Sequence, residues 1–149
     1  MIEPTLNIKC DALIVVDVQQ DFCNGGAFAI RGCDGVVRAL NRWLSIDGLL
    51  KVATRHWHPE HHCSFRDDGG RLPRHCVADG PGAEFHPALE ADNFYRIVSK
   101  GKSPNGCLGS ALENEEFEVF LNQQGIRRLW VGGLGVELGV RFEVRTALE

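Results

Sequence analysis

Long apolar runs, an excess of positive charge and an export signal are all missing from this sequence of 149 residues. The longest purely apolar run is Ala12–Val16, far short of the roughly 20 residues that a membrane-spanning helix needs. Sixteen Lys and Arg against twenty Asp and Glu give a formal net charge of −4, which disfavours a nucleic-acid partner. The N-terminus has no basic segment followed by an apolar one. These absences predict a cytoplasmic protein without a nucleic-acid or membrane partner.

Cysteine is not scarce, but the features of a secreted disulfide-rich chain are absent. In a cytoplasmic protein, thiols stay reduced or bind metal more often than they pair. We therefore expect reduced thiols or metal ligands rather than three disulfides. The six cysteines are Cys10, Cys23, Cys33, Cys63, Cys76 and Cys107.

Four short segments have the composition of buried strands. Apolar runs without polar alternation are typical of strands that are covered on both faces. The 17 glycines, about 11% of the chain against a usual ~7%, favour many tight junctions between strands and loops. The expected strands are Ala12–Val16, Leu49–Ala53, Phe94–Val98 and Leu129–Val131.

Helical periodicity lies between and after these runs. The apolar stripes are Val36, Val37, Leu40, Trp43 and Leu44, then Leu112, Phe117, Phe120 and Leu121, and finally Val136, Val140 and Val144. The resulting order of strands and crossover helices predicts an α/β fold, a doubly wound open parallel sheet with helices on both faces. Length favours a single domain over residues 1–149.

Chemically distinctive residues follow each expected strand. Asp17 follows the first strand, His56 and His58 the second, Lys100 the third, and the glycine-rich turn Gly132–Gly135 the fourth. In doubly wound sheets, ligands bind at the carboxyl ends of the strands. Each residue alone has an ordinary structural explanation, such as a turn or a solvated strand end. Their arrival at one edge of one sheet favours a functional site.

Two histidines in this set have the spacing of metal ligands. In extended chain, His56 and His58 lie on one face, about 6.5 to 7 Å apart along the strand. A third ligand would come from the irregular stretch His56–Glu90, whose length is typical of functional loops. The candidates are His61, His62, His75, His86, Cys63 and Cys76. We interpret His61, His62 and His86 as ordinary loop histidines, and rank a closed zinc site at Cys63 and Cys76 below an open histidine site.

Five motifs resemble those of nicotinamidases and, more widely, of isochorismatase-like cysteine hydrolases. Their order and spacing cover nearly the whole chain. They are DALIVVDVQQDFCNGG at 11–26, ATRHWHPEHHCSF at 53–65, LPRHCVADGPGAEFHP at 72–87, VSKG at 98–101 and VGGLGVELGVRF at 131–142. The resemblance implies hydrolysis of the amide of nicotinamide through an enzyme thioester, on an α/β sheet of the kind expected above.

The resemblance also implies roles for individual residues. Asp17 matches the general base, and Lys100 matches the ammonium of the catalytic triad. His58 and His75 match ligands of a divalent metal, usually zinc, which holds the pyridine nitrogen of the substrate. Phe22 matches a wall of the aromatic pocket.

The oxyanion hole is implied by the same resemblance. The backbone N–H groups of Gly135 and Gly139 match its two donors, and the Leu134–Gly135 peptide takes the place of the family's cis bond. A cis bond before a residue other than proline costs about 3 to 4 kcal/mol, and glycine is the least hindered residue to follow one.

Several residues depart from the family pattern. The family's nucleophilic cysteine falls on Gly139, so the sulfur is missing. His56 stands in place of an aspartate ligand, which predicts a site of three histidines, His56, His58 and His75, a known zinc arrangement. Leu72 replaces a tryptophan of the pocket. A further aromatic stretch of the family appears as Gly109–Leu112, and relatives continue through further strand–helix units, so we expect a fold shortened at its C-terminus.

Two functions remain open on this reading. The first is an impaired nicotinamidase-type hydrolase in which metal-bound water, or a thiol such as Cys76 or Cys107, replaces the missing nucleophile. The second is a catalytically inactive homologue that binds metal and a nicotinamide-like small molecule. The apolar strand Leu129–Val131, expected at an uncovered edge, additionally predicts a homo-oligomer.

Overall fold

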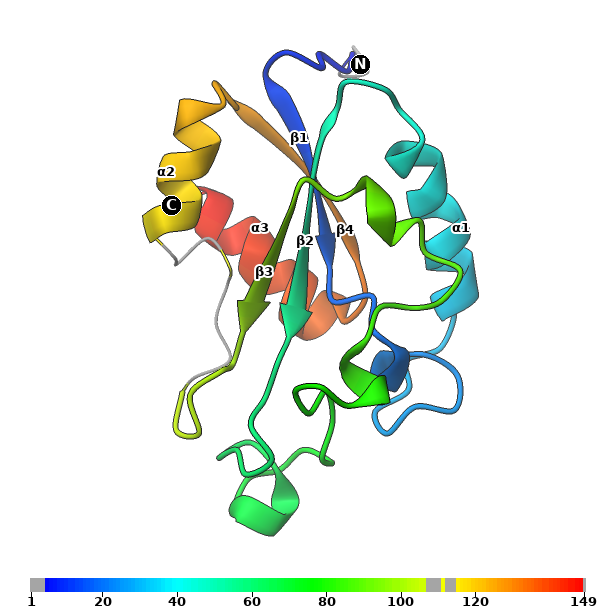
Figure 1. The fold of residues 1–149 in the computed structure, drawn as a ribbon, viewed down its shortest axis with the longest axis vertical. Coiled ribbons are helices and arrows are strands. Elements are labelled where there is room, and N and C mark those ends of the chain that lie inside the picture. The colour runs from blue at the N-terminus through cyan, green and yellow to red at the C-terminus, as the bar shows by residue number, and fades with distance from the viewer. Residues whose placement is uncertain (1–4, 107–110, 112–114, 149) are drawn as a thin grey trace.

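The computed structural model describes residues 5–106, 111 and 115–148, and its centre is one parallel sheet of four strands (Figure 1). The spatial order of the strands is β3-β2-β1-β4, so the chain reverses direction across the sheet after β3. The expected doubly wound α/β fold is confirmed. The strands are β1 (Asp11–Val16), β2 (Leu50–His56), β3 (Arg96–Lys100) and β4 (Arg128–Gly133).

The register of the sheet brings the carboxyl ends of the strands together. Val16 of β1 pairs with Thr54 of β2 on one side and with Gly133 of β4 on the other. His56 at the end of β2 pairs with Lys100 at the end of β3. The residues that follow the strands therefore meet at one edge, as the strand-end pattern predicted.

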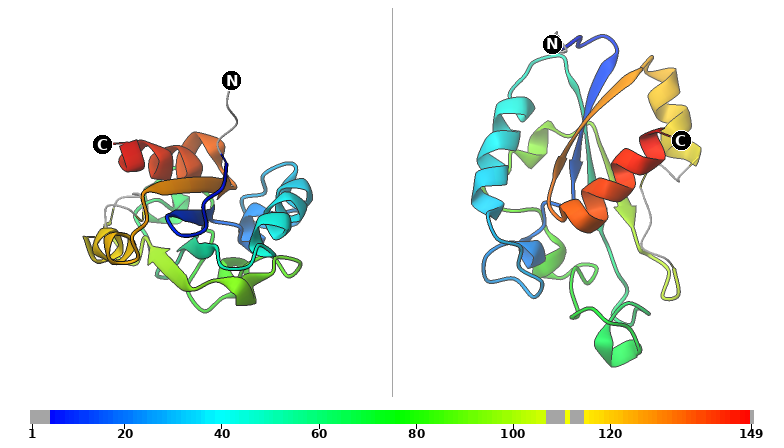
Figure 2. Two further views of the ribbon diagram at one scale, coloured as in Figure 1. Left: turned by 90° about the horizontal axis from the view of Figure 1, so that it is seen from above. Right: turned by 180° about the vertical axis from the view of Figure 1, so that it is seen from behind.

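Three α-helices cover the two faces of the sheet: α1 (Cys33–Leu44) on one face, α2 (Glu115–Gln123) and α3 (Arg141–Leu148) on the other (Figure 2). All six side chains of β1 are buried. Alternate residues of a strand point to opposite faces, so Leu13 belongs to the core under α1 and Ile14 to the core under α2. This explains why the sequence of β1 has no polar alternation.

Element boundaries differ from the sequence prediction in two places. Strands β2 and β3 run two to three residues further than expected and end at His56 and Lys100, because their polar ends keep pairing beyond the apolar run. The stripe that begins at Val136 is a π-helical turn over Val136–Val140 followed by α3. Val136 and Val144 are exposed, so the expected apolar stripe does not pack against the sheet along its whole length. Leu112 and Gly109 lie outside the described residues.

The cysteine prediction was wrong for one pair. Cys23 and Cys33 form a disulfide with a Cα–Cα distance of 5.4 Å, within the usual range for such bridges. They are only 10 residues apart, and the intervening loop turns back so that Cys33, the first residue of α1, meets Cys23. Among the described cysteines the remaining three, Cys10, Cys63 and Cys76, are free thiols.

The long loop after β2 is anchored by a buried glutamine. Gln19 is fully buried, and its side-chain amide donates to the carbonyls of His56 at 2.7 Å and Ala83 at 2.8 Å. The backbone N–H of His56 donates back to Oε1 of Gln19. This side chain therefore fixes the loop against the end of β2.

In the part of the chain that the structure describes, no helix is both long and apolar enough to span a membrane.

Candidate active site

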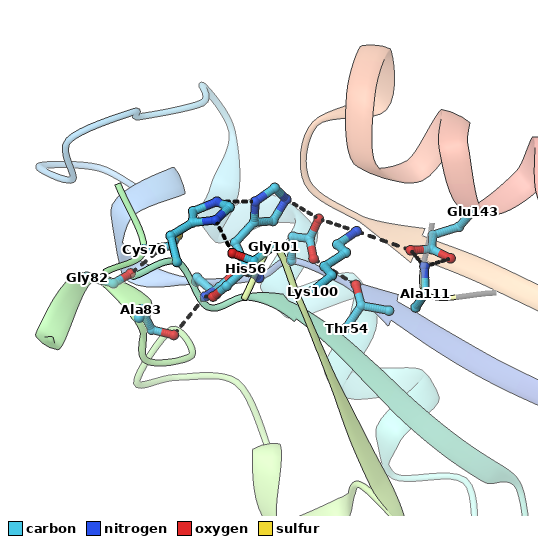
Figure 3. A network of polar contacts seen from close by, with 12 residues as sticks. Thr54, His56, Cys76, Gly82, Ala83, Lys100, Gly101, Ala111 and Glu143 are labelled. Atoms are coloured by element: carbon cyan, nitrogen blue, oxygen red, sulfur yellow. Dashed lines mark hydrogen bonds and ion pairs between the residues drawn. The ribbon is translucent and has the colours of Figure 1, made fainter. Parts of the chain in front are cut away.

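Asp17 lies at the centre of a polar network at the carboxyl ends of the strands. Figure 3 labels its three partners Thr54, His56 and Lys100. The hydroxyl of Thr54 donates to Oδ1 of Asp17 at 2.7 Å, while Oδ2 contacts Lys100 Nζ at 3.0 Å and His56 Nε2 at 3.1 Å. Asp17 is 2% exposed and has a left-handed backbone, φ 54°. A residue other than glycine with such a φ is uncommon and tends to occur at functional sites.

The carboxylate of Asp17 is held in its ionised form. Burial alone would raise its pKa, but His56, Lys100 and the Thr54 hydroxyl together outweigh burial and hold the pKa of Asp17 well below its ordinary value. The pKa of Lys100 is raised, because Asp17 and Glu143 outweigh the burial that opposes its charge. The pair is therefore carboxylate and ammonium at neutral pH.

Glu143 is a participant that the sequence did not reveal. It is fully buried on α3, and its Oε1 lies 3.1 Å from Lys100 Nζ (Figure 3). The backbone N–H of Ala111 donates to both carboxylate oxygens. Lys100 thus lies between two buried carboxylates, Asp17 and Glu143. Nothing in the sequence distinguished Glu143 from the solvated glutamates of the same region.

Three histidines converge beside Asp17. His56, His58 and His75 each place one ring nitrogen within 4.8 Å of the others. Nδ1 of His58 lies 2.9 Å from the Gly101 carbonyl, and Nδ1 of His75 lies 2.7 Å from the Pro73 carbonyl. A carbonyl can only accept, so both Nδ1 atoms carry the proton and both Nε2 atoms keep a free lone pair. This is the arrangement that carbonyl groups impose on metal-binding histidines.

Burial keeps the rings of His58 and His75 neutral. It lowers the pKa of His58 to about 3 and that of His75 to about 4, and the neighbouring histidines add to the shift in both cases. Hydrogen bonds to the Gly101 and Pro73 carbonyls oppose it only in part. Neutral imidazole is the form that binds metal.

His56 connects this cluster to Asp17. Its Nδ1 lies 2.9 Å from Nε2 of His58, and its Nε2 lies 3.1 Å from Oδ2 of Asp17. Both neighbours are acceptors, so without a metal His56 satisfies both only when both its nitrogens carry protons. A metal at the cluster would take the place of the Nδ1 proton and leave Nε2–H with Asp17.

His62 is buried beside this cluster, but it is not one of the histidines whose ligand atoms converge, so our interpretation of it as a histidine outside the ligand set is not contradicted. It is 1% exposed, and its ring centroid lies 4.2 Å from that of His58. Its Nδ1 contacts Ser64, whereas its buried Nε2 has no hydrogen-bond partner among the described residues. Buried polar atoms are rarely left without a partner. The fit to a metal ion comes instead from the converging nitrogens of His56, His58 and His75, with the Nδ1 atoms of His58 and His75 held by carbonyls.

The other ligand candidates do not converge on this site. His61 is largely exposed and pairs with Asp68. Cys63 is exposed, and burial raises the pKa of the Cys76 thiol far above its ordinary value. Among the described residues, Cys63 and Cys76 form no common group of ligand atoms, which leaves the closed zinc site unsupported. Cys107 lies outside the described residues.

A cavity of about 140 Å³ opens onto this network. Its walls are mostly aromatic and aliphatic, and its polar lining includes Asp17, His56, His75 and Lys100. Such an apolar pocket with a few converging polar groups is typical of small-molecule sites. Phe22 and Leu72, both expected to line the pocket, do so. The remaining lining residues are Phe28, Ile30, Leu134, Gly135, Glu137, Gly139 and Phe142.

Gly139 lies directly against Asp17. A Cβ atom built on Gly139 would lie 2.7 Å from Asp17 Oδ2 and 3.2 Å from Val16 Cγ1. Gly135 has a φ of 69°, and its carbonyl accepts the N–H of Val140 at 3.3 Å. The expected cis bond at Leu134–Gly135 is absent, because every peptide bond among the described residues is trans. Gly135 reaches its place through a left-handed φ instead.

A model of the isochorismatase domain family matches residues 11–149. Among curated proteins, the Escherichia coli K12 nicotinamidase is 32% identical over 162 residues, which cover 93% of this chain and 76% of that protein. The Mycobacterium tuberculosis nicotinamidase/pyrazinamidase is 34% identical over 145 residues, 92% of this chain and 78% of that protein.

Solved structures of similar proteins superpose closely on this chain. A protein from L. infantum, determined in complex with nicotinate, superposes with a TM-score of 0.91 at 31% identity and covers 97% of this chain and 76% of its own. The pyrazinamidase of Pyrococcus horikoshii, determined in complex with zinc, has a TM-score of 0.84 at 40% identity, with 93% and 78% covered.

Proposed function

This chain belongs to the isochorismatase family, and from that premise we propose that it is a nicotinamidase-type protein that binds a nicotinamide-like carboxamide but hydrolyses it poorly. The observation that carries the proposal is the position of Gly139. This residue lies against Asp17 and lines the same pocket as Lys100, where the family motif has its cysteine. The charged groups Asp17 and Lys100 beside residue 139 are retained, whereas the nucleophilic sulfur is missing.

Asp17 and Lys100 supply the electrostatics of the site. Lys100 contacts Oδ2 of Asp17 at 3.0 Å and keeps it ionised. In this proposal Asp17 is the group that would accept a proton from an attacking nucleophile, and the N–H groups of Gly135 and Gly139 would donate to the carboxamide oxygen. Phe22 and Leu72 would bound the ring of the ligand, which the apolar lining of the cavity suits.

The histidines would hold a divalent metal, which we propose is zinc. His56, His58 and His75 would be the ligands. A metal bound there would coordinate the ring nitrogen of a pyridine ligand and so orient its carboxamide. The relative determined with zinc and the one determined with nicotinate support this choice of metal and ligand.

Hydrolysis should be slow for two physical reasons. An attacking nucleophile held in line is worth an effective molarity of up to about 10⁵ to 10⁸ M, which backbone donors do not replace. A general base works best when its pKa is near the working pH, and the pKa of Asp17 lies far below it. Water activated by Asp17 is therefore a weak substitute for a thiolate.

One observation favours a second candidate, a binding protein without turnover. His56 engages Oδ2 of Asp17, the oxygen that Lys100 also contacts. With both partners in place, that oxygen has little capacity left to take a proton from a nucleophile. The site would then recognise a ligand without acting on it.

Ligand binding tests the proposal separately from catalysis. Calorimetric titration of the zinc-loaded protein with nicotinamide should give measurable binding, and the His58→Ala variant should bind at least tenfold more weakly. His61→Ala is the matched control, because His61 is exposed and outside the cluster. Absence of binding by the zinc-loaded protein, or equal binding by His58→Ala, would reject the proposal.

A further inference from the structure

A second group of metal-ligating atoms lies outside the histidine cluster. Cys23, Cys33 and His86 each place one ligand atom within 4.8 Å of the other two. Cys23 directly follows the short 3-10 helix Gln20–Phe22, and Cys33 is the first residue of α1. His86 comes from the distant loop after β2, where its backbone N–H donates to the Val18 carbonyl. Two cysteines that are 10 residues apart and a histidine from a distant loop therefore converge on one point.

We propose that these three residues form a second metal site, for zinc or a similar thiophilic divalent ion, which is available when the thiols are reduced and closed when they are joined. Two thiolates and an imidazole are a donor set that zinc favours, and Zn–S bonds of about 2.3 Å in a tetrahedron separate two sulfurs by about 3.8 Å. The two sulfurs are joined in this structure, so they would have to move apart to that separation after reduction, while the His86 ligand atom already lies within 4.8 Å of both.

The surroundings suit such a site. Cys23 and Cys33 are 3% and 0% exposed, so water competes little for the ion. Nε2 of His86 lies 3.7 Å from Oδ1 of Asp34, and Nδ1 accepts the N–H of Ala88 at 3.2 Å. The Nδ1 contact is within hydrogen-bond range and the Nε2 contact is beyond it, so Nε2 is the nitrogen that is more readily available to a metal. A carboxylate beside a histidine ligand orients its ring, and Asp34 is in place to do so or to complete the tetrahedron.

Oxidation and metal binding exclude each other at this site. With a small-molecule disulfide as the oxidant, one thiolate attacks it to form a mixed disulfide and releases one thiol. The second cysteine then displaces the other thiol, so the protein disulfide forms while the oxidant is reduced to two thiols. Both sulfurs lose their thiolate charge, and the ion is released.

The site lies beside the active-site pocket. The loop between Cys23 and Cys33 carries Phe28 and Ile30, which line the cavity. Phe28 packs against Phe22 and His75, with ring centroids 5.9 Å and 5.4 Å away. Either the disulfide or the metal would link the two ends of the loop between Cys23 and Cys33. In the reduced, metal-free protein this link would be absent.

Cobalt(II) spectroscopy of the full chain tests the proposal. After reduction and removal of the reductant, added Co²⁺ should produce a thiolate-to-cobalt charge-transfer band in the near ultraviolet. The histidine cluster contains no thiolate and gives no such band. An equivalent of a small-molecule disulfide should then abolish the band and release the ion. No charge-transfer band in the reduced protein, or a band that survives oxidation, would overturn the proposal.

Variants assign the band to these residues. Cys23→Ser should lose it, whereas Cys63→Ser, a change at an exposed thiol, should keep it. His86→Ala, at a partly exposed position, provides a second test if Cys23→Ser does not fold, and should weaken Co²⁺ binding at least tenfold. An unchanged band in Cys23→Ser, or unchanged affinity in His86→Ala, would contradict the assignment.

Discussion

A Cβ atom built on Gly139 would lie 2.7 Å from Oδ2 of Asp17, well inside van der Waals contact. The carboxylate of Asp17 thus uses space that any side chain at position 139 would need. Oδ2 is also held by Lys100 at 3.0 Å and His56 at 3.1 Å, so it cannot move away without losing charged contacts. The position of the Asp17 carboxylate therefore depends on the absence of a side chain at residue 139.

Gly139→Ala should therefore destabilise the protein. The added methyl group overpacks a buried polar network, which typically costs about 1 to 3 kcal/mol. Urea unfolding measures the change in the free energy of unfolding. Gly35→Ala is the matched control, because its Cβ would have nothing nearer than 4.0 Å, and alanine stabilises a helix relative to glycine by about 0.5 to 1 kcal/mol. Equal stability of Gly139→Ala and the unmodified protein would show that Asp17 moves freely.

Metal content should depend on the histidine cluster. Protein never exposed to a chelator should contain one divalent ion per chain at His56, His58 and His75, in addition to any ion at the reduced cysteine pair. His58→Ala should lose the cluster ion, because the remaining rings no longer complete the set. Elemental analysis of the oxidised protein, in which the cysteine pair is closed, measures this directly. Full metal content in His58→Ala would contradict the ligand assignment.

Stability of the metal-free protein should fall as the pH falls below about 6.5. The folded-state pKa values of His58 and His75 are lowered to about 3 and about 4, whereas the unfolded chain titrates near its ordinary value. Between the folded-state and the unfolded-state pKa values, the unfolded chain binds protons that the folded protein does not bind. The free energy of unfolding is therefore highest above pH 6.5 and decreases on acidification. Each ring changes the free energy of unfolding by at most about 1.4 kcal/mol per pH unit.

Urea unfolding in the presence of chelator between pH 7 and pH 5 measures that slope. His75→Asn should reduce it by about one proton, while His61→Gln, a change at an exposed ring, should leave it unchanged. A pH-independent free energy of unfolding over this range would show that the histidines are not held neutral.

The strand β4 should mediate self-association. It lies at the edge of the sheet and pairs only with β1 among the described strands. A strand at the edge of a sheet leaves one row of backbone groups without a strand partner, and edges of this kind recruit another chain. Sedimentation at micromolar concentration should show a dimer or larger species. A monomer at that concentration would mean that the edge is protected in another way.

The sequence was sufficient for the sheet and for much of the site. Buried parallel strands require uninterrupted apolar runs, so β1 was visible as Ala12–Val16, and the carboxyl-end rule then placed Asp17, His56 and Lys100 together. The register confirms this for His56 and Lys100, which pair directly. These predictions succeeded because they depend on local periodicity and on one topological rule.

Other features depend on long-range packing and were not visible. The burial of Glu143 depends on how α3 places it against Lys100 and the backbone of Ala111, and no helical pattern specifies those contacts. The burial of His62 depends on a loop whose path is fixed by backbone contacts such as that of Cys63 N–H with the Pro104 carbonyl. The disulfide depends on the turn between Cys23 and Cys33. Spacing alone indicates none of these contacts.

Ammonia release from nicotinamide tests the central claim most directly. The zinc-loaded unmodified protein and its Gly139→Cys variant are compared under single-turnover conditions, with Gly139→Ala as the control for the added Cβ. The account predicts release near background for the unmodified protein and for Gly139→Ala, and partial release for Gly139→Cys, where a thiol adjoins Asp17 and Lys100. Substantial release by the unmodified protein would contradict it and assign the hydrolysis to another nucleophile.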